Sequence, residues 1–194
     1  DDAALEVDLP DHYVSRAAQK LVAALDAFGV DPAGRLALDM GASTGGFTQV
    51  LREREAEPVI ALDVGHDQLA PEVRADPGVI VVEGFNVRDL TPERLAAASG
   101  ITGRLGLVTG DLSFISLRHV LPGVVATAAP LADVVLLVKP QFEVGRGGVR
   151  EGVVHDPGLR ADAVAGILWS AWDAGLGTCG VIASPIVGTH GNRE

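Results

Sequence analysis

Apolar positions along the chain follow two different periods. Short apolar runs predict buried strands at 36–39, 59–63, 79–82, 105–109, 133–138 and 178–183. Apolar residues at helical spacing predict helices at 16–28, from a glycine-rich loop to 54, and at 92–98, 117–128 and 159–174. This alternation predicts an α/β fold: a Rossmann-like, doubly wound, mostly parallel sheet with helices on both faces.

The composition favours a single domain. With 194 residues, 47% of them hydrophobic, the chain is long enough for one well-packed core and too short for two large ones. It has no run of about 18 apolar residues and no signal-peptide pattern, so we expect a cytoplasmic location. The single cysteine, Cys179, excludes an internal disulfide. We expect Cys179 to be buried, and Trp169 and Trp172 to be packing residues of the last helix.

The two ends of the sequence indicate that elements are missing from it. The chain begins at Asp1, and its only methionine is Met40. It stops at Glu194, where a turn should lead into another strand. We therefore expect residues 1–14 to be an irregular lead-in, residues 15–194 to form the domain, and the last strand of the sheet to lie beyond the sequence.

The net charge of −11 argues against a nucleic-acid partner, because phosphate contacts need Lys and Arg. The acidic residues cluster near the start of the chain and again at 53–57, however. The total can therefore hide a local basic patch, and a domain outside the sequence could also supply positive charge.

The stretch 38–48 holds the most informative pattern. An apolar run ends at Asp39, and three glycines follow before the next helix, as in a strand-to-helix turn that lets backbone approach a ligand closely. Ser43 stands where a dinucleotide fingerprint needs its second glycine. The pattern D-x-G-x-x-x-G-G-F instead resembles motif I of S-adenosylmethionine-dependent methyltransferases.

Polar residues end four of the predicted strands: Asp39, Asp63, Asp111 and Lys139. A parallel sheet delivers such residues to one edge, where ligands bind. For any single aspartate, a helix cap or a turn is an equally good explanation, but four polar ends favour a site. Asp63 follows Asp39 by 24 residues, close to the spacing of roughly 20 at which an acid meets ribose hydroxyls.

Two lysines stand in unusual positions. Lys20 lies at the edge of the apolar stripe of the first predicted helix, where a lysine usually extends along the surface to reach solvent. Lys139 closes a run of five apolar residues and precedes Pro140, so we expect it to be desolvated and usable in proton transfer.

Five segments together resemble the TlyA, or hemolysin A, family and span nearly the whole chain: YVSRAAQKL (13–21), the 39–48 loop, DLSFIS (111–116), VKPQFE (138–143) and VVHDP (153–157). The resemblance implies a ribosomal RNA 2′-O-methyltransferase with an FtsJ-like catalytic domain. It also implies S-adenosyl-L-methionine as cofactor, ribosomal subunits as partners and cytidines of the small- and large-subunit RNA as targets. The family usually carries an amino-terminal S4-type RNA-binding domain, so residues 1–14 would be the linker from it.

The resemblance also implies residue roles. The catalytic tetrad would be Lys20, Asp111, Lys139 and Glu194. The cofactor would contact Asp39, Gly41, Ser43, Gly45, Gly46, Phe47, Asp63, Asn86 and Asp111, with its ribose near Asp63 and its adenine near Asn86. Our hypothesis is that Lys139 takes or shares the proton of the attacking 2′-hydroxyl, while Asp111 and Glu194 orient the lysines. No metal is implied.

Three other functions fit parts of the sequence. Residues 41–45 match the G-x-S-x-G elbow of α/β hydrolases, with Asp133 and His155 or His190 in the right order, although this leaves the lysines unexplained. A non-catalytic RNA-binding or ribosome-assembly factor would need no cofactor. Pore formation, which the hemolysin label suggests, would need an amphipathic membrane element that the sequence lacks.

Overall fold

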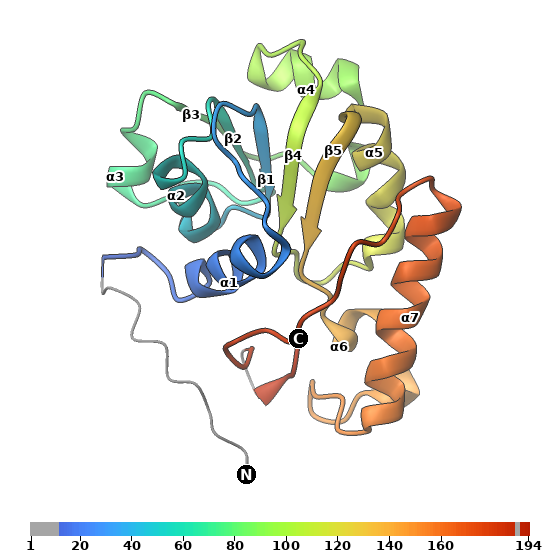
Figure 1. Ribbon diagram of the computed structural model, residues 1–194. Coiled ribbons are helices and arrows are strands. Elements are labelled where there is room, and N and C mark those ends of the chain that lie inside the picture. The colour runs from blue at the N-terminus through green and yellow to red at the C-terminus, as the bar shows by residue number, and fades with distance from the viewer. Residues whose placement is uncertain (1–11, 189–190) are drawn as a thin grey trace.

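The computed structural model describes residues 12–188 and 191–194, and its core is a five-stranded parallel sheet in the order β3-β2-β1-β4-β5 (Figure 1). The strands are β1 (Ala37–Met40), β2 (Val59–Leu62), β3 (Val79–Val82), β4 (Leu105–Gly110) and β5 (Ala128–Leu136). The α-helices are α1 (Ala18–Phe28), α2 (Gly46–Glu53), α3 (Pro71–Arg74), α4 (Pro92–Ser99), α5 (Leu121–Thr127), α6 (Pro140–Glu143) and α7 (Pro157–Asp173). The 3-10 helices are η1 (Val87–Asp89), η2 (Leu117–His119) and η3 (Arg146–Gly148).

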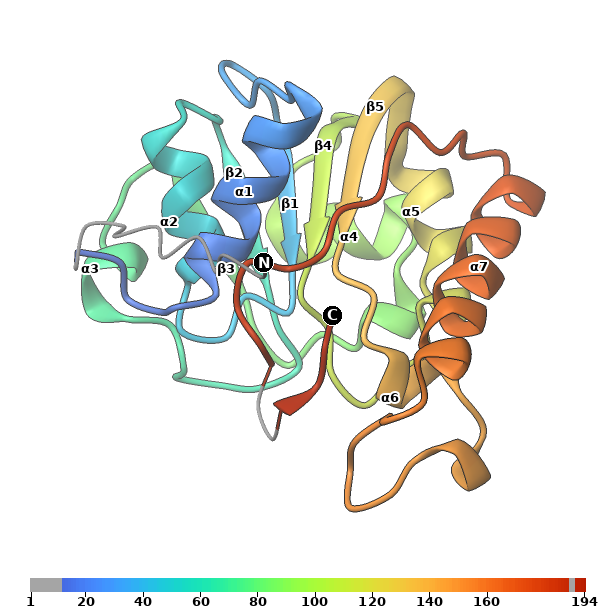
Figure 2. The ribbon, with the colours of Figure 1, turned by 60° about the horizontal axis from the view of Figure 1, so that its bottom comes forward.

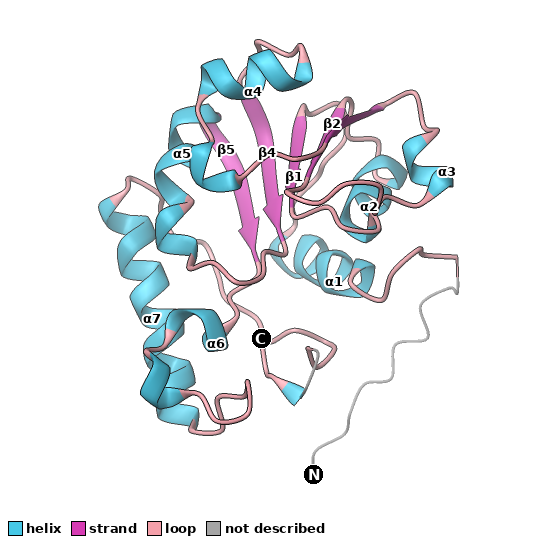
Figure 3. Ribbon diagram, turned by 180° about the vertical axis from the view of Figure 1, so that it is seen from behind, coloured by secondary structure: helices cyan, strands magenta, loops and turns pink. Residues whose placement is uncertain are grey.

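The sheet lies between two helical layers (Figures 1 and 3). Successive residues of β1 face opposite sides of the sheet, so its four buried residues serve two cores. Leu38 and Met40 pack with side chains of α4, α5 and α7. Ala37 packs on the other face with side chains of α1 and α2. The predicted doubly wound α/β fold is thereby confirmed.

The strand register brings the carboxyl ends of the central strands to one level. Met40 pairs with Leu62 of β2 on one side and with Gly110 of β4 on the other. Gly110 pairs in turn with Leu136 of β5. The chain moves outward from β1 through β2 to β3, and then returns to the other side of β1 for β4. Such a switch point is where open α/β sheets bind ligands.

The predicted strand at 178–183 is wrong. The segment after α7 runs alongside β5 without pairing with it (Figure 2), and Val181 and Ile182 are exposed. A cavity of about 1110 Å³ lies between this segment and β5, so no neighbouring strand is close enough to complete a hydrogen-bonded ladder. An apolar run is thus insufficient for a strand without a partner. A closing strand beyond the sequence stays a prediction.

The predicted helix at 117–128 is also divided differently. The chain forms η2 and then α5, which ends at Thr127, and β5 begins at Ala128, five residues before the predicted start. Pro122 occupies the first turn of α5, where its missing N–H costs nothing. The early part of β5 is irregular, since its pairing with β4 shifts near Leu105.

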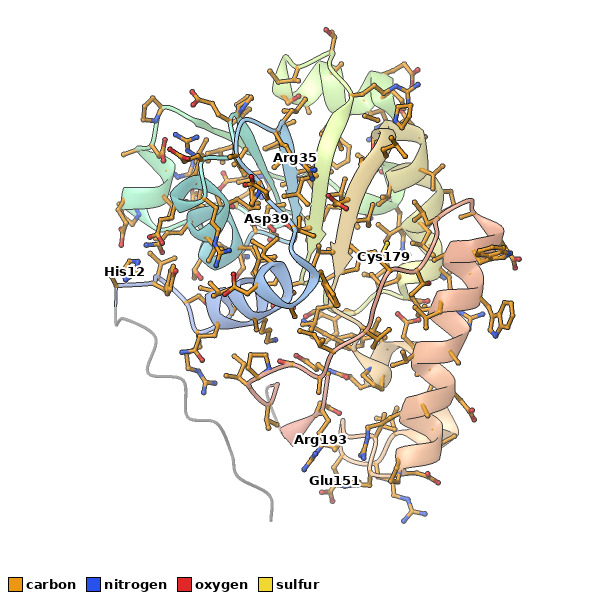
Figure 4. The ribbon with its side chains drawn as sticks, in the orientation of Figure 1. His12, Arg35, Asp39, Glu151, Cys179 and Arg193 are labelled. Atoms are coloured by element: carbon orange, nitrogen blue, oxygen red, sulfur yellow. The ribbon has the colours of Figure 1, made fainter. Side chains whose placement is uncertain are left out.

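Two expectations about burial are wrong as well. Cys179 is exposed, because the segment that carries it does not join the sheet (Figure 4). Trp169 and Trp172 are 70% and 66% exposed on α7. That helix buries Ala163 and Ile167 against the sheet instead, so the two tryptophans are not core residues.

Burial in the middle of the sheet predicts a large stability difference between two leucines. Leu107 is fully buried, whereas Leu131 is fully exposed. Leu107→Ala should therefore lower the free energy of unfolding by about 2–5 kcal/mol through lost burial and a residual cavity. Leu131→Ala should change it by less than about 0.5 kcal/mol. Denaturant titration of both variants checks this, and equal losses would contradict the assigned core.

Candidate active site

Lys20, Asp111, Lys139 and Glu194 meet at the carboxyl edge of the sheet, although they come from four separate segments. Asp111 Oδ1 lies 2.6 Å from Lys139 Nζ, at ion-pair distance but outside hydrogen-bonding angles. Asp111 Oδ2 lies 3.5 Å from Lys20 Nζ. Lys20 Nζ also donates a 2.6 Å hydrogen bond to Glu194 Oε2. The Asp111 carboxylate thus lies between two ammonium groups, and the four side chains form one ion-pair network.

The ion-pair network is largely shielded from water. Its side chains are 10% (Lys20), 15% (Asp111), 11% (Lys139) and 3% (Glu194) exposed. The expectation that Lys139 is desolvated is confirmed, and Lys20 is directed into the network and does not extend to solvent. Two positive and two negative charges balance, and loss of one member would leave a buried charge at a cost of about 3–5 kcal/mol.

Glu194 is held in place by its neighbour Asn192, to which the sequence reasoning gave no role of its own. Asn192 is 3% exposed. Its Nδ2 donates to the carbonyl of Gly152 over 2.9 Å, and its Oδ1 accepts from the backbone N–H of Val154 over 3.3 Å. The backbone carbonyl of Glu194 also accepts from the N–H of Ser184. These bonds attach the last residues both to the loop that precedes α7 and to the segment that follows it.

The glycine loop (residues 41–46) lies against the segment that carries Asp111. Gly41 has φ +80°, and a Cβ there would lie 3.1 Å from the carbonyl oxygen of Asp111. Gly45 has φ +100°, and a Cβ there would come within 2.9 Å of the Leu69 side chain. Both positions therefore require glycine. Because the contact at Gly41 is so close, the predicted cofactor loop and the ion-pair network share one site.

Asp63, directly after β2, closes the other side of the glycine loop. Its Oδ2 accepts a 2.8 Å hydrogen bond from the N–H of Ser43, and its Oδ1 accepts from the N–H of Gly65, also over 2.8 Å. Asn86 is exposed after β3 and accepts a hydrogen bond from the N–H of Arg88, so it caps η1. Both predicted cofactor residues therefore lie at the carboxyl edge of the sheet.

Asp39 lies beneath the glycine loop, fully buried within β1 (Figure 4). Its Oδ2 accepts a 2.7 Å hydrogen bond from Thr48 Oγ1 on α2, and Thr109 Oγ1 on β4 lies 3.4 Å from its Oδ1. Burial raises the pKa of Asp39 from 3.8 to about 7; the hydrogen bond from Thr48 opposes the shift, and the charge of Asp111 adds to it. Phe47, another predicted cofactor residue, packs in the core beside α1.

Two residues of the site were missed by the sequence reasoning. Ser113 Oγ accepts a 2.9 Å hydrogen bond from Lys139 Nζ. Phe114 is 88% exposed, has φ +63°, and its ring centroid lies 5.2 Å from that of Phe142. The available signal for Phe114 was a large aromatic residue in the loop directly after Asp111. Its exposure and backbone conformation depend on the folded loop.

The hydrolase alternative does not fit the geometry. Asp133 pairs with Leu107, which in turn pairs with Ala37 at the start of β1. This places Asp133 away from the carboxyl edge that carries Ser43. Asp133 forms an ion pair with Arg35 instead (2.5 Å). His155 is exposed, and His190 lies outside the described residues.

The part of the chain that the structure describes contains no helix long and apolar enough to cross a membrane. Across residues 12–188 and 191–194, no group of three or more His, Cys, Asp and Glu side chains is arranged to hold a metal ion.

The glycine loop, the acids at the strand ends and the sheet order define the class of protein as a Rossmann-like domain with a ligand site at the carboxyl edge of its sheet. The family model described as FtsJ-like methyltransferase matches residues 13–194, so the chain belongs to this family. A solved S-adenosylmethionine-dependent methyltransferase from Mesorhizobium loti shares the fold, with a TM-score of 0.50 and 18% identity over 63% of this chain and 55% of that one.

More similar relatives belong to the TlyA group, which confirms the resemblance read from the sequence. The 16S/23S rRNA (cytidine-2′-O)-methyltransferase TlyA of Mycobacterium tuberculosis (strain CDC 1551 / Oshkosh) is 55% identical over 94% of this chain and 66% of its own length. Hemolysin A of Brachyspira hyodysenteriae is 38% identical over 94% of this chain and 74% of its own. The crystal structure of a candidate hemolysin from Lactococcus lactis matches with a TM-score of 0.89 and 39% identity, over 93% of this chain and 85% of that one.

The buried carboxyl of Asp39 predicts a specific pH dependence of stability. The folded state keeps the Asp39 proton up to about pH 7, whereas the unfolded chain releases it near 3.8. The contribution of Asp39 to stability should therefore fall between about pH 4 and 7, by up to about 1.4 kcal/mol per pH unit. Asn has the same shape as Asp but does not titrate. The difference in free energy of unfolding between wild type and Asp39→Asn should therefore change with pH at this rate.

Denaturant titrations from pH 4.5 to 8 measure the Asp39 contribution. The exposed Asp162→Asn variant is the control and should run parallel to wild type over the whole range. A wild-type curve parallel to that of Asp39→Asn would show that Asp39 ionises normally.

Proposed function

We propose that this protein is an S-adenosyl-L-methionine-dependent 2′-O-methyltransferase that acts on the ribose of cytidines in ribosomal RNA. The observation that carries the proposal is the buried network of two lysines and two carboxylates against the glycine loop at the sheet edge. The family membership and the M. tuberculosis relative support the choice of substrate. The chain spans about two thirds of that relative's length.

The residues at the sheet edge fit the cofactor. The carboxylate of Asp63, whose oxygens each have a second lone pair, would accept bonds from the two ribose hydroxyls. The backbone of Gly41, Ser43, Gly45 and Gly46, at the start of α2, would hold the methionine end, and Asn86 would lie near the adenine. Cofactor contacts were also predicted for Asp39 and Phe47, but both side chains are buried, so they would support this loop from below instead.

Lys139 would handle the proton of the reaction. When bound, the cofactor would supply a methyl group on a cationic sulfonium, for transfer to an oxygen nucleophile with the neutral thioether as the leaving group. The acceptor 2′-hydroxyl has to lose its proton as it attacks. Lys139 Nζ, an ammonium in the ion-pair network, would first release its own proton to solvent and then accept that of the hydroxyl. Asp111 would stabilise the ammonium that forms, since its Oδ1 lies 2.6 Å away. Asp111 also pairs with Lys20, so its negative charge is divided between the two lysines and stabilises the Lys139 ammonium less than a separate carboxylate would.

Lys20 and Glu194 would set the position of Asp111. Glu194 holds Lys20 Nζ at 2.6 Å, so that the lysine faces Asp111 and not solvent. On the open side of the site, the exposed ring of Phe114 offers a stacking surface to a base of the acceptor RNA. The protein's net charge of −11 makes such local contacts more important, because its average surface repels phosphate.

Cofactor binding tests the ribose role of Asp63. Asp63→Ala removes a ligand of the ribose hydroxyls and two hydrogen bonds to the loop backbone, so S-adenosyl-L-methionine should bind at least tenfold more weakly. Asp162→Ala, on exposed α7, should bind like wild type. Calorimetric titration measures both, and equal affinities would remove Asp63 from the cofactor site.

Substitution of Lys139 tests the catalytic role. Lys139→Arg keeps a positive charge beside Asp111, but a guanidinium does not release its proton near neutral pH. Methyl transfer to ribosomal subunits should therefore fall by about 10²–10⁴-fold in both Lys139→Arg and Lys139→Ala. Cofactor affinity should change by less than about threefold. Near-wild-type turnover in the folded Lys139→Arg protein would exclude Lys139 as the base.

A further inference from the structure

Glu143, the last residue of α6, holds the segment that carries Asp111. Its Oε2 accepts a 2.6 Å hydrogen bond from Ser116 Oγ, and its Oε1 accepts a 2.8 Å hydrogen bond from the backbone N–H of Leu117. Both donors belong to the Asp111 loop, defined here as residues 111–117. The Glu143 carboxylate thereby holds the carboxyl-terminal end of the loop, whereas Asp111 stands at its amino-terminal end.

The same short stretch of chain also supplies Lys139. α6 begins at Pro140, so only three residues separate Lys139 from Glu143 at the end of the helix. Lys139 contacts the start of the Asp111 loop through Asp111 and Ser113. The stretch 139–143 therefore contacts both ends of the Asp111 loop: Lys139 contacts its first residues and Glu143 its last ones.

The loop is anchored in the core by Leu112, Ile115 and Leu117, and its polar residues need separate support. Between β4 and η2 it has no regular secondary structure. Phe114 adopts φ +63°, in the left-handed region, which costs energy for a residue with a side chain. Such a conformation persists only when neighbouring contacts enforce it. Such contacts include the tilted packing of Phe142 on Phe114, the hydrogen bond from Lys139 to Ser113 and the two hydrogen bonds to Glu143.

We propose that Glu143 is a positioning residue for methyl transfer: it holds the Asp111 loop so that Asp111 and Phe114 keep their places relative to Lys139. The inference rests on the proposed function. Glu143 touches neither the lysines nor the cofactor loop in the contacts described above, so its effect passes through the loop. A displacement of about 1 Å at the reacting groups can cost about 10²-fold in rate.

The test compares Glu143→Ala, Glu143→Gln and Ser116→Ala in the whole protein. Glu143→Ala should lower kcat about 10–100-fold, while cofactor affinity stays within about threefold because the glycine loop and Asp63 remain. Glu143→Gln can still accept from Leu117 and donate to Ser116, so it should keep at least about a third of the activity. Ser116→Ala should lie between, and the double variant with Glu143→Ala should be no worse than Glu143→Ala alone.

Hydrogen exchange supplies a readout that does not depend on activity. The Leu117 amide is bonded to Glu143, so exchange across 111–117 should speed up at least tenfold in Glu143→Ala. Glu72→Ala, an exposed glutamate on α3, is the matched control and should alter neither exchange nor turnover.

The outcomes separate the two proposals. Unchanged exchange of 111–117 in Glu143→Ala would overturn the positioning role whatever the activity, as would faster exchange with unchanged kcat. A parallel loss of cofactor affinity and kcat in all the variants would indicate a merely structural role and overturn it too. Full turnover by Lys139→Arg would instead overturn the proposed base.

Discussion

The carboxylate of Asp111 is the group on which the rest of the site depends. Lys20 and Lys139 would repel each other in a region that excludes most water, and Asp111 compensates both because one oxygen faces each ammonium. Glu194 adds the second negative charge and makes the network neutral. The four groups come from α1, the ends of β4 and β5, and the last residue of the chain. The network therefore forms only when all four segments are in place, so site assembly is coupled to folding.

The use of basic residues fits this arrangement. Of the 15 lysines and arginines in the chain, only Lys20 and Lys139 are lysines, and both lie in the network. Arginine forms the ion pairs elsewhere, for example with Asp76 and Asp133. A guanidinium keeps its proton at any physiological pH, whereas an amine in a desolvated site can release one. Both lysines, whose cationic group can release a proton, therefore lie where proton transfer is proposed.

The sheet edge accounts for most of the site's geometry. β1, β2, β4 and β5 end at one level, and the residues that follow them are delivered together. The glycine at 41 lets the cofactor loop touch the backbone of Asp111, so the two halves of the site are in direct contact. Asp39, two positions before Gly41, is too deep to share this surface and instead joins α2 to β4 through Thr48 and Thr109.

The sequence by itself determined the alternation of strands and helices, the glycine loop and the polar strand ends, because these follow from local periodicity and from backbone rules. The local patterns also singled out Lys20, Asp111 and Lys139, and the motif resemblance added Glu194 and the assignment of the four to one tetrad. The tertiary structure decided what depends on distant neighbours: that 178–183 lacks a strand partner, that Lys20 points inward to Glu194 across 174 positions of sequence, and that Glu143 reaches the Asp111 loop. Such contacts are set by packing between elements, and no local pattern encodes them.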